Sequence, residues 1–240
     1  GTFMTALEKS KCINMADEIG NIVTLTPSLY KALCDTPREI FAPVAHRAYS
    51  LDAQPIGGNQ WISSPLTVAK MTMALECENM DNILEIGCGS GYQAAILSKL
   101  AHRIFSVERI EKLAMEAKKR FEALKIKNVH VRYDDGNNGW RSYAPFDRIL
   151  LSAAADEISP NLFKQLKNGG ILVAPMKKDG KQFIAKFKII SLKLTSSPRE
   201  IGICAVFCGA NFNHTSAALA TPGAGLHKRQ LRQQRGRRFL

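Results

Sequence analysis

Beyond the first third of the chain, hydrophobic and polar positions follow two alternating patterns. Short apolar runs, typical of buried strands, are separated by longer segments in which apolar residues recur at helical spacing. For example, the recurrence of Leu113, Ala117, Phe121 and Leu124 predicts an amphipathic helix over 110–124. The predicted strands are 82–86, 103–108, 129–133, 146–152, 171–174, 182–190 and 201–207.

Strands that alternate with helices predict an α/β fold, with a mostly parallel, seven-stranded sheet and helices on both faces. Helices are also predicted over 92–100 and 159–166, the second ending before Asn168-Gly169-Gly170. No helical pattern separates the last two strands, so they are predicted to pair antiparallel at one end of the sheet. Residues 1–81 carry mainly helical patterns and predict an N-terminal cap on the same domain, over the strand ends.

Composition is ordinary for a globular protein, and charge distinguishes only the C-terminus. The 240 residues are 45% hydrophobic and 22% charged, with a formal net charge of +12. Six of the 33 bases and none of the 21 acids lie after Glu200, so residues 1–200 carry 27 − 21 = +6. We therefore predict a core over 82–208 and a basic tail over 209–240. A disordered or vector-derived tail explains the bases better than an arm that binds nucleic acid.

The sequence also disfavours membrane and metal-binding proteins. No apolar run approaches the roughly 18 residues of a membrane span, and charged residues interrupt the N-terminus where a secretion signal would have its apolar core. The six cysteines form no C-x-x-C pair and the five histidines show no ligand spacing, so no metal site is predicted. Scattered thiols fit a reducing compartment, and we expect a cytoplasmic protein without a membrane partner.

A glycine cluster follows the first predicted strand, at the start of a helix. It reads Gly87-Cys88-Gly89-Ser90-Gly91, and its backbone N–H groups could face an anionic group. A dinucleotide fingerprint would need a glycine where Tyr92 stands. The spacing G-x-G-x-G alone is a weak signal that a tight turn would also explain, and Cys88 is expected only to fit that turn.

Acidic residues at the next two strand ends strengthen the signal. Glu108 ends the second strand, where a carboxylate can accept hydrogen bonds from both hydroxyls of a ribose. Asp135-Gly136 follows the third strand, where a carboxylate could accept from an adenine amino group. Solvated strand ends are the alternative. Three features at successive strand ends favour a pocket for an adenosine with a small anionic attachment, which S-adenosylmethionine fits.

Several further segments match a known family over roughly residues 35–203. The most specific are Gln60-Trp61-Ile62-Ser63-Ser64-Pro65, the triple alanine at 153–155 and Gln165-Leu166. Other matching segments are 37–41, 48–49, 55–59, 84–93, 107–109, 135–136 and 167–170. On these residues the chain resembles protein-L-isoaspartate O-methyltransferase, and the resemblance implies a Rossmann-like class I methyltransferase fold.

The resemblance also implies an activity and a set of site residues. The family transfers a methyl group from S-adenosylmethionine, leaving S-adenosylhomocysteine, to the α-carboxylate of L-isoaspartyl residues in aged proteins. The ester then closes to a succinimide, and hydrolysis returns part of it to aspartate. The implied site residues are Trp61, Ile62, Ser63, Glu85, Gly87, Cys88, Gly89, Ser90, Gly91, Glu108, Arg109, Asp135 and Gly136, with Ser63 catalytic and Glu85 at the cofactor's amino end. We expect no metal, and a monomer whose partners are aged proteins and peptides.

Ser63 also has a purely structural interpretation. Serine before Pro65 is a common helix start, so Ser63-Ser64 could simply cap a helix over 66–75. With the resemblance, Ser63 is predicted to orient the substrate and Ser64 to cap the helix. The resemblance weakens over 206–210, where relatives have a Phe-Val-Pro-Leu-like segment, and a frameshifted or vector-derived C-terminus would explain this departure.

Two other functions remain open from the sequence. A nucleic-acid methyltransferase would share the cofactor fold and suit the positive charge. Base N-methylation commonly uses an Asn/Asp-Pro-Pro-Tyr/Phe motif after the fourth strand, whereas this chain has Ser152-Ala153-Ala154-Ala155 there. The second is a non-catalytic module that recognises aged or C-terminal carboxylates, which the intact glycine cluster and Ser63 argue against.

Overall fold

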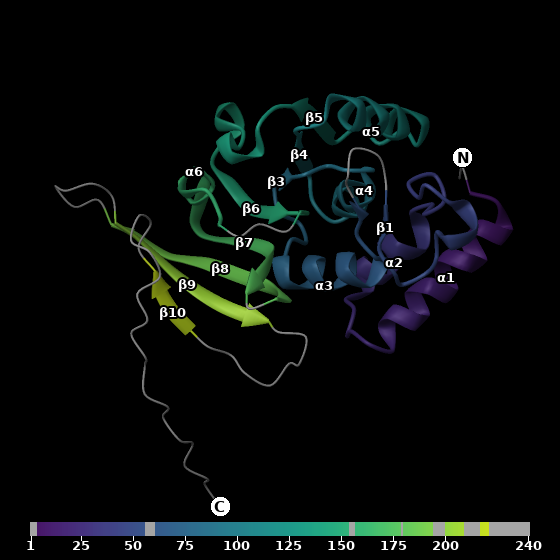
Figure 1. Ribbon diagram of the computed structural model, residues 1–240, viewed down its shortest axis with the longest axis horizontal. Coiled ribbons are helices and arrows are strands. Elements are labelled where there is room, and N and C mark those ends of the chain that lie inside the picture. Colours follow the sequence, from purple (N-terminus) through teal and green to yellow (C-terminus); the bar gives the residue numbers. More distant parts are fainter. Residues whose placement is uncertain are drawn as a thin grey trace, which may run out of the picture.

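One large sheet runs through the molecule, with helices on both of its faces (Figure 1). The computed structural model describes residues 4–55, 61–153, 157–178, 180–193, 200–208 and 217–220. In the sheet the strands follow the order β10-β9-β8-β7-β6-β3-β4-β5. The reversal at β3, whose neighbours are β4 on one side and β6 on the other, creates the crevice in which ligands of such sheets bind.

The sheet has a parallel half and an antiparallel half. β3 to β7 pair in parallel, and β8, β9 and β10 extend the sheet by antiparallel pairs. The strands are β3 Asn82–Ile86, β4 Arg103–Glu108, β5 Val129–Tyr133, β6 Phe146–Leu151, β7 Leu166–Lys178, β8 Lys181–Lys193, β9 Glu200–Cys208 and β10 Ala217–Ala220. Two short strands, β1 Gln54–Pro55 and β2 Trp61–Ile62, form a separate antiparallel pair.

The sheet departs from the prediction at two places. It has eight strands in the described part of the chain, not seven, because β10 pairs with β9 inside the predicted tail. The remaining tail residues lie outside the described ones. β7 begins at Leu166 instead of 171, and the helix predicted over 159–166 shrinks to the single turn α6 Pro160–Phe163. The cause is Leu166, which is buried and pairs with Phe146 in the sheet.

The helices of the N-terminal cap begin where the sequence supplies capping residues. They are α1 Ala6–Gly20, α2 Pro27–Asp35, the 3₁₀ turn η1 Ala45–Arg47 and α3 Pro65–Leu75. Thr26 and Ser64 each accept a hydrogen bond from the third residue of the following helix and precede a proline at its first position. The prediction that Ser64 caps the helix is therefore confirmed.

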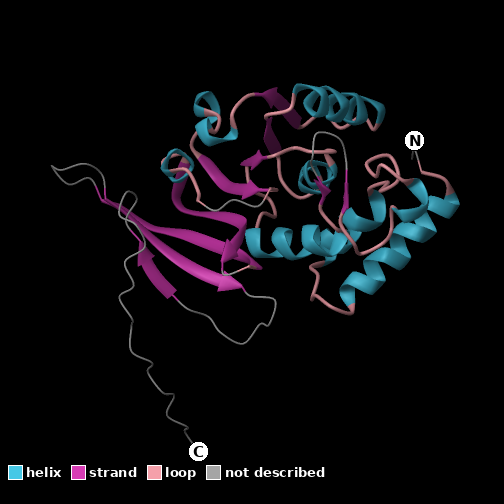
Figure 2. Cartoon of the chain, in the orientation of Figure 1, coloured by secondary structure: helices cyan, strands magenta, loops and turns pink. Residues whose placement is uncertain are grey.

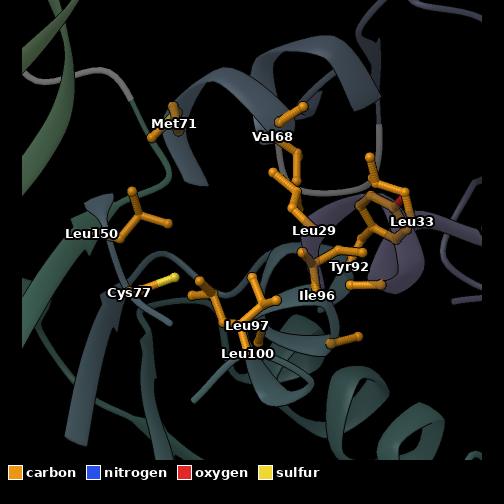
Figure 3. Close-up of a cluster of buried hydrophobic side chains, with 14 of the residues drawn as sticks. Leu29, Leu33, Val68, Met71, Cys77, Tyr92, Ile96, Leu97, Leu100 and Leu150 are labelled. Atoms are coloured by element: carbon orange, nitrogen blue, oxygen red, sulfur yellow. The ribbon is translucent and has the colours of Figure 1, made fainter. Parts of the chain in front are cut away.

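The two faces of the sheet bury two separate hydrophobic clusters. Ile83 and Leu84 are consecutive in β3, and because side chains alternate along a strand they belong to different clusters. The Ile83 cluster lies under the cap and is shown in Figure 3, where Leu29, Met71 and Leu97 converge from α2, α3 and α4. Burial of each such side chain contributes about 1.5–3 kcal/mol. The sheet is thus covered on both faces, as predicted.

The remaining helices follow the parallel strands. They are α4 Tyr92–Ser98, α5 Glu111–Ala123 and the 3₁₀ turns η2 Gly136–Asn138 and η3 Arg141–Tyr143. Figure 2 shows the helices gathered around the parallel half, while β8, β9 and β10 extend away from them. Among the described residues, no helix is long and apolar enough to cross a membrane.

Candidate functional site

The glycine cluster, here called the glycine loop (residues 87–91), connects β3 to α4. Gly87, Gly89 and Gly91 have φ angles of +90°, +55° and +96°, in the region that favours glycine. A Cβ on Gly91 would lie 2.8 Å from Cζ of Phe121 in α5. The loop is therefore closed to side chains at this position, and α4 can begin at Tyr92 directly beside the strand end.

Glu108, at the end of β4, holds the glycine loop in place. Its Oε2 accepts a hydrogen bond from the Gly89 N–H (2.9 Å), and its Oε1 accepts from the Ile110 N–H (2.9 Å). The residue is 4% exposed. A carboxylate can accept about four hydrogen bonds, so two sites remain for a ligand. The geometry is therefore compatible with the predicted hydrogen bonds from ribose hydroxyls to Glu108, which remain a prediction.

Glu85 is fully buried behind the glycine loop. Its carboxylate accepts hydrogen bonds from Oγ of Ser106 (2.5 Å) and Oγ of Ser152 (3.2 Å). Burial raises the pKa of Glu85 to about 8, with a smaller contribution from the negative charge of Glu108. Glu85 does not itself line the cavity described next, but Ser152 does, and it connects the carboxylate to that space.

A cavity of about 510 Å³ lies over the carboxyl ends of the parallel strands. It is bounded by the N-terminal cap on one side and the glycine loop on the other. Its lining residues are Ala53, Ile62, Ser63, Ser64, Thr67, Val68, Met71, Gly87, Cys88, Gly89, Ser90, Tyr92, Gln93, Glu108, Ser152, Ala153, Pro175 and Gln182. Burial raises the pKa of the Cys88 thiol well above its ordinary value, so the thiol stays protonated. This agrees with the expectation that Cys88 is a small residue that fits the turn and has no chemical role.

A second cavity, of about 150 Å³, adjoins the first at Gly87, Glu108 and Ala153. It is lined by Arg109 and Gly136 together with the apolar side chains Ile86, Val107, Leu151 and Leu162. Gly136 lies against β3 so closely that an added Cβ would be 2.4 Å from Cγ2 of Ile86. Asn137, Glu157 and Ser159 add polar groups to this lining, and a small slot with apolar walls and a few polar groups can hold a heteroaromatic base.

Asp135 lies next to this slot without lining it. Its side chain accepts a hydrogen bond from the Asn137 N–H (2.9 Å) and caps η2. Its predicted hydrogen bond to an adenine amino group therefore stays a prediction. The side chain of Trp61 lies outside the described structure, although its backbone is part of β2.

Ser63 faces the larger cavity, and a buried arginine holds its backbone. Nη2 of Arg38 donates to the Ser63 carbonyl (3.1 Å) and Nε donates to the Ala48 carbonyl (3.1 Å). The guanidinium lies 4.3 Å from the centre of the Tyr92 ring. Arg38 is 0% exposed, and its Nη1 has no partner among the described residues. One buried cation thus connects the cap, Ser63 and the first residue after the glycine loop.

Arg120 of α5 makes a similar connection to the glycine loop. Its Nη1 donates to the Ser90 carbonyl (3.0 Å) and its Nε to the Ile40 carbonyl (3.0 Å). Sequence reasoning missed both arginines, as well as Ser106, because each acts on a residue distant in the chain. The family resemblance includes the segment 37–41 but implies no role for Arg38.

The residues present fit S-adenosylmethionine. The three glycines of the glycine loop have positive φ angles and Gly91 has no room for a Cβ, Glu108 keeps free acceptor positions, and two cavities adjoin one another at Glu108. Among the described residues, no group of three or more His, Cys, Asp or Glu side chains is arranged to hold a metal ion. The glycine loop and Glu108 would hold the amino acid and ribose parts of the cofactor, and the slot its base.

The sheet order, the glycine loop and Glu108 at the strand end are typical of the Rossmann-like methyltransferases that use S-adenosylmethionine, and the family match places the chain in that class. The chain belongs to the family described as protein-L-isoaspartate(D-aspartate) O-methyltransferase (PCMT), whose model matches residues 9–200. The predicted fold class and family are thereby confirmed.

Relatives from bacteria support this assignment. The protein-L-isoaspartate O-methyltransferase of Helicobacter pylori (strain G27) is 53% identical over 175 residues, which cover 72% of this chain and 84% of that protein. The enzyme of the same name from Maricaulis maris (strain MCS10) is 47% identical over 158 residues, or 65% of this chain and 74% of its own length.

Solved structures share the fold. One protein-L-isoaspartate O-methyltransferase has a TM-score of 0.69 at 24% identity, over 90% of this chain and 66% of its own. A Plasmodium falciparum protein, described as a beta-aspartate methyltransferase (PCMT) in complex with S-adenosyl-L-homocysteine, has a TM-score of 0.67 at 18% identity, over 86% and 98%. At these identities the likeness concerns the fold alone.

Proposed function

We propose that this chain transfers a methyl group from S-adenosylmethionine to the α-carboxylate of L-isoaspartyl residues in aged proteins and peptides, and that Ser63 orients that carboxylate. The observation that carries the proposal is the position of Ser63 in the same cavity as the glycine loop and Glu108. The family and its relatives support the reaction. We further propose that the chain acts as a monomer and that nucleic acid is not its substrate.

The chemistry places few demands on the protein. The acceptor carboxylate, with an ordinary pKa near 4, is ionised at pH 7, so no general base is needed. When bound, S-adenosylmethionine supplies an electrophilic methyl group with its own leaving group. The chain's contribution is placement of the acceptor oxygen in line with that methyl group, which can be worth several kcal/mol.

The lining of the cavity suits this task. Among its described residues Glu108 is the one carboxylate, and it is held by backbone N–H groups on the loop side. A serine hydroxyl can donate a hydrogen bond to the acceptor carboxylate without giving up its proton. Ile62, Val68 and Met71 give the cavity an apolar wall that excludes water, which favours a reaction in which charges are neutralised.

Labelled methyl transfer tests the function. An isoaspartyl peptide, its aspartyl twin and bulk RNA are offered as acceptors, and we expect base-labile label on the isoaspartyl peptide only. Ser63→Ala should lower kcat by roughly 10- to 100-fold, the usual loss when one positioned hydrogen bond is removed. The affinity for S-adenosylhomocysteine should be unchanged. Label on RNA, or full activity of Ser63→Ala, would contradict the proposal.

A further inference from the structure

The structure holds the chain's two Asn-Gly steps in different ways. In such a step the glycine nitrogen can attack the asparagine side chain with little steric resistance, because glycine has no side chain. The steps are Asn138-Gly139, at the end of η2, and Asn168-Gly169, near the start of β7. The attack requires the peptide group between the two residues to rotate, so the contacts of that group decide which step reacts.

The peptide between Asn138 and Gly139 is fixed at both polar atoms. The Gly139 N–H donates to the Gly136 carbonyl (3.0 Å), and the Asn138 carbonyl accepts from Nε2 of Gln165 (2.8 Å). Gly139 is buried, and a Cβ there would lie 2.4 Å from Oε1 of Gln165. Rotation would break both hydrogen bonds inside a crowded space, so this step is protected.

The peptide between Asn168 and Gly169 lies in an exposed bulge. Leu166 pairs with Phe146 and Ile171 with Arg148, so β7 advances 171 − 166 = 5 residues where β6 advances 148 − 146 = 2. Three residues of β7 are therefore looped out. Asn168 and Gly169 are both exposed, and no atom lies within 4 Å of a Cβ placed on Gly169. The space around Gly169 is therefore open, in contrast to the crowded surroundings of Gly139, and we infer that the peptide group before Gly169 rotates more readily.

Asn168 also lies far from the cavity of its own molecule. The cavity is at the carboxyl ends of the parallel strands, beside Gly87 and Ala153, whereas Asn168 lies near the amino end of β7, level with the start of β6. The six residues of β6 span roughly 20 Å between these two edges. A modified residue 168 can therefore reach Ser63 only in a second molecule.

We propose that Asn168 is converted to L-isoaspartate as the protein ages, and that an intact copy of this chain then methylates it. The methylation step rests on the proposed function. First, the Gly169 nitrogen bonds to Cγ of Asn168, the bond from Cγ to the side-chain nitrogen breaks, and ammonia leaves with the glycine proton. Water then opens the succinimide ring at the main-chain carbonyl, which leaves a free α-carboxylate. One oxygen of that carboxylate accepts the methyl group, and no proton is transferred.

The first experiment follows ageing without reference to activity. Wild type, Asn168→Gln and the matched control Asn138→Gln are incubated at neutral pH and mapped by mass spectrometry after digestion with a protease that cleaves at aspartate but not at isoaspartate. Glutamine would need a larger ring, so it closes slowly. We expect isoaspartate at position 168 to form at least tenfold faster than at 138, in wild type and in Asn138→Gln alike. Equal rates at the two steps would overturn the assignment.

The second experiment uses the aged proteins as acceptors. A trace of fresh enzyme with labelled S-adenosylmethionine receives aged wild type, aged Asn168→Gln or a synthetic isoaspartyl peptide. We expect label at residue 168 of aged wild type, several times less label on aged Asn168→Gln, and label on the peptide. A labelled peptide beside unlabelled aged wild type would overturn the methylation of this site. If neither is labelled while isoaspartate is mapped at 168, the proposed function is overturned and the ageing result stands.

Discussion

The proposed site has two halves, here called the cofactor half and the acceptor half, which are built on different principles. The cofactor half, which comprises the glycine loop, Glu85 and Glu108, is fixed by backbone conformation and by hydrogen bonds at the strand ends. The acceptor half, centred on Ser63, is fixed by Arg38, whose side chain lies 25 residues away in the sequence. The cofactor half is encoded locally and can be recognised in a short stretch of chain. The acceptor half depends on a tertiary contact.

The two halves also differ in what they cost in folding stability. The cofactor half uses glycines where side chains would be strained, whereas the acceptor half uses a buried cation without a carboxylate partner among the described residues. Burial lowers the pKa of Arg38, although an arginine stays charged under ordinary conditions. Burying a charge is costly unless it is well hydrogen-bonded, so Arg38 stabilises one arrangement of Ser63 at some expense to overall stability.

The largest change in free energy is expected from the titration of Glu85, which belongs to the cofactor half. Its pKa rises from an ordinary 4.5 to about 8 on folding, so the folded state holds a proton that the unfolded state has lost between these values. The free energy of unfolding should therefore fall as the pH rises from 4.5 to 8, by at most about 5 kcal/mol.

Urea unfolding at a series of pH values, without cofactor, measures this effect. Glu85→Gln should be much less pH dependent than wild type, because its amide cannot ionise. Glu111→Gln, which changes an exposed glutamate at the start of α5, is the matched control and should keep the wild-type profile. Equal pH profiles for wild type and Glu85→Gln would contradict the prediction.

Gly91→Val should weaken cofactor binding, with a smaller change in free energy than the one expected for Glu85. The substitution places a β-branched side chain at φ +96° and against the Phe121 ring, at a cost of about 3 kcal/mol. We expect the Kd for S-adenosylhomocysteine, measured by calorimetry, to rise roughly 100-fold. Gly20→Ala is the control, since a Cβ at Gly20 meets no atom within 4 Å. Tight binding by Gly91→Val would show that the loop tolerates another conformation.

Arg38→Lys should separate the two halves. Lysine keeps the charge but cannot donate to the Ser63 and Ala48 carbonyls from one rigid plane. We expect kcat for the isoaspartyl peptide to fall about tenfold, which corresponds to about 1.4 kcal/mol, with little change in the Kd for S-adenosylhomocysteine. Arg120→Lys, which loosens the Ser90 carbonyl instead, should mainly weaken cofactor binding. The comparison fails if the two variants show the same pattern.

The smallest change in free energy is expected for substitutions of the two adjacent serines, Ser63 and Ser64, in the acceptor half. Ser64→Ala removes the hydrogen bond to the Thr67 N–H that begins α3, and it should lower the free energy of unfolding by about 1 kcal/mol. Ser63→Ala should leave stability nearly unchanged and reduce turnover. Thermal unfolding of both variants measures the difference. A larger loss of stability in Ser63→Ala would favour the capping interpretation of that residue.

Much of the cofactor half could be predicted from the sequence because its rules are local. Gly87, Gly89 and Gly91 follow an apolar run directly, and Glu108 ends the next run, so their positions in the fold follow from strand order. The parallel sheet with helices on both faces could be predicted for the same reason. The roles of these residues toward a cofactor remain predictions.

The start of β7, the presence of β10 and the role of Arg38 could not be predicted from local sequence patterns. β7 begins early because Leu166 pairs with Phe146, a contact that no periodicity in 159–166 indicates. β10 consists of three alanines and one leucine in a segment whose composition predicts a tail. Arg38 looks like any surface arginine until the fold places Ser63 and Tyr92 around it. In each case the deciding interaction joins residues that are distant along the chain.

The position of β3 also bears on how the chain is made on the ribosome. β4 begins 103 − 86 = 17 residues after β3 ends and is available early as a partner, but the other neighbour of β3, β6, begins 146 − 86 = 60 residues after β3 ends. At about 5–20 residues per second, the second edge of β3 stays open for roughly 3 to 12 seconds. Glu85 lies in that strand, and until Ser152 and the rest of the sheet enclose it, it is a charged residue that discourages association with another nascent chain. The same side chain, whose burial costs stability in the finished protein, would thus protect the unfinished one.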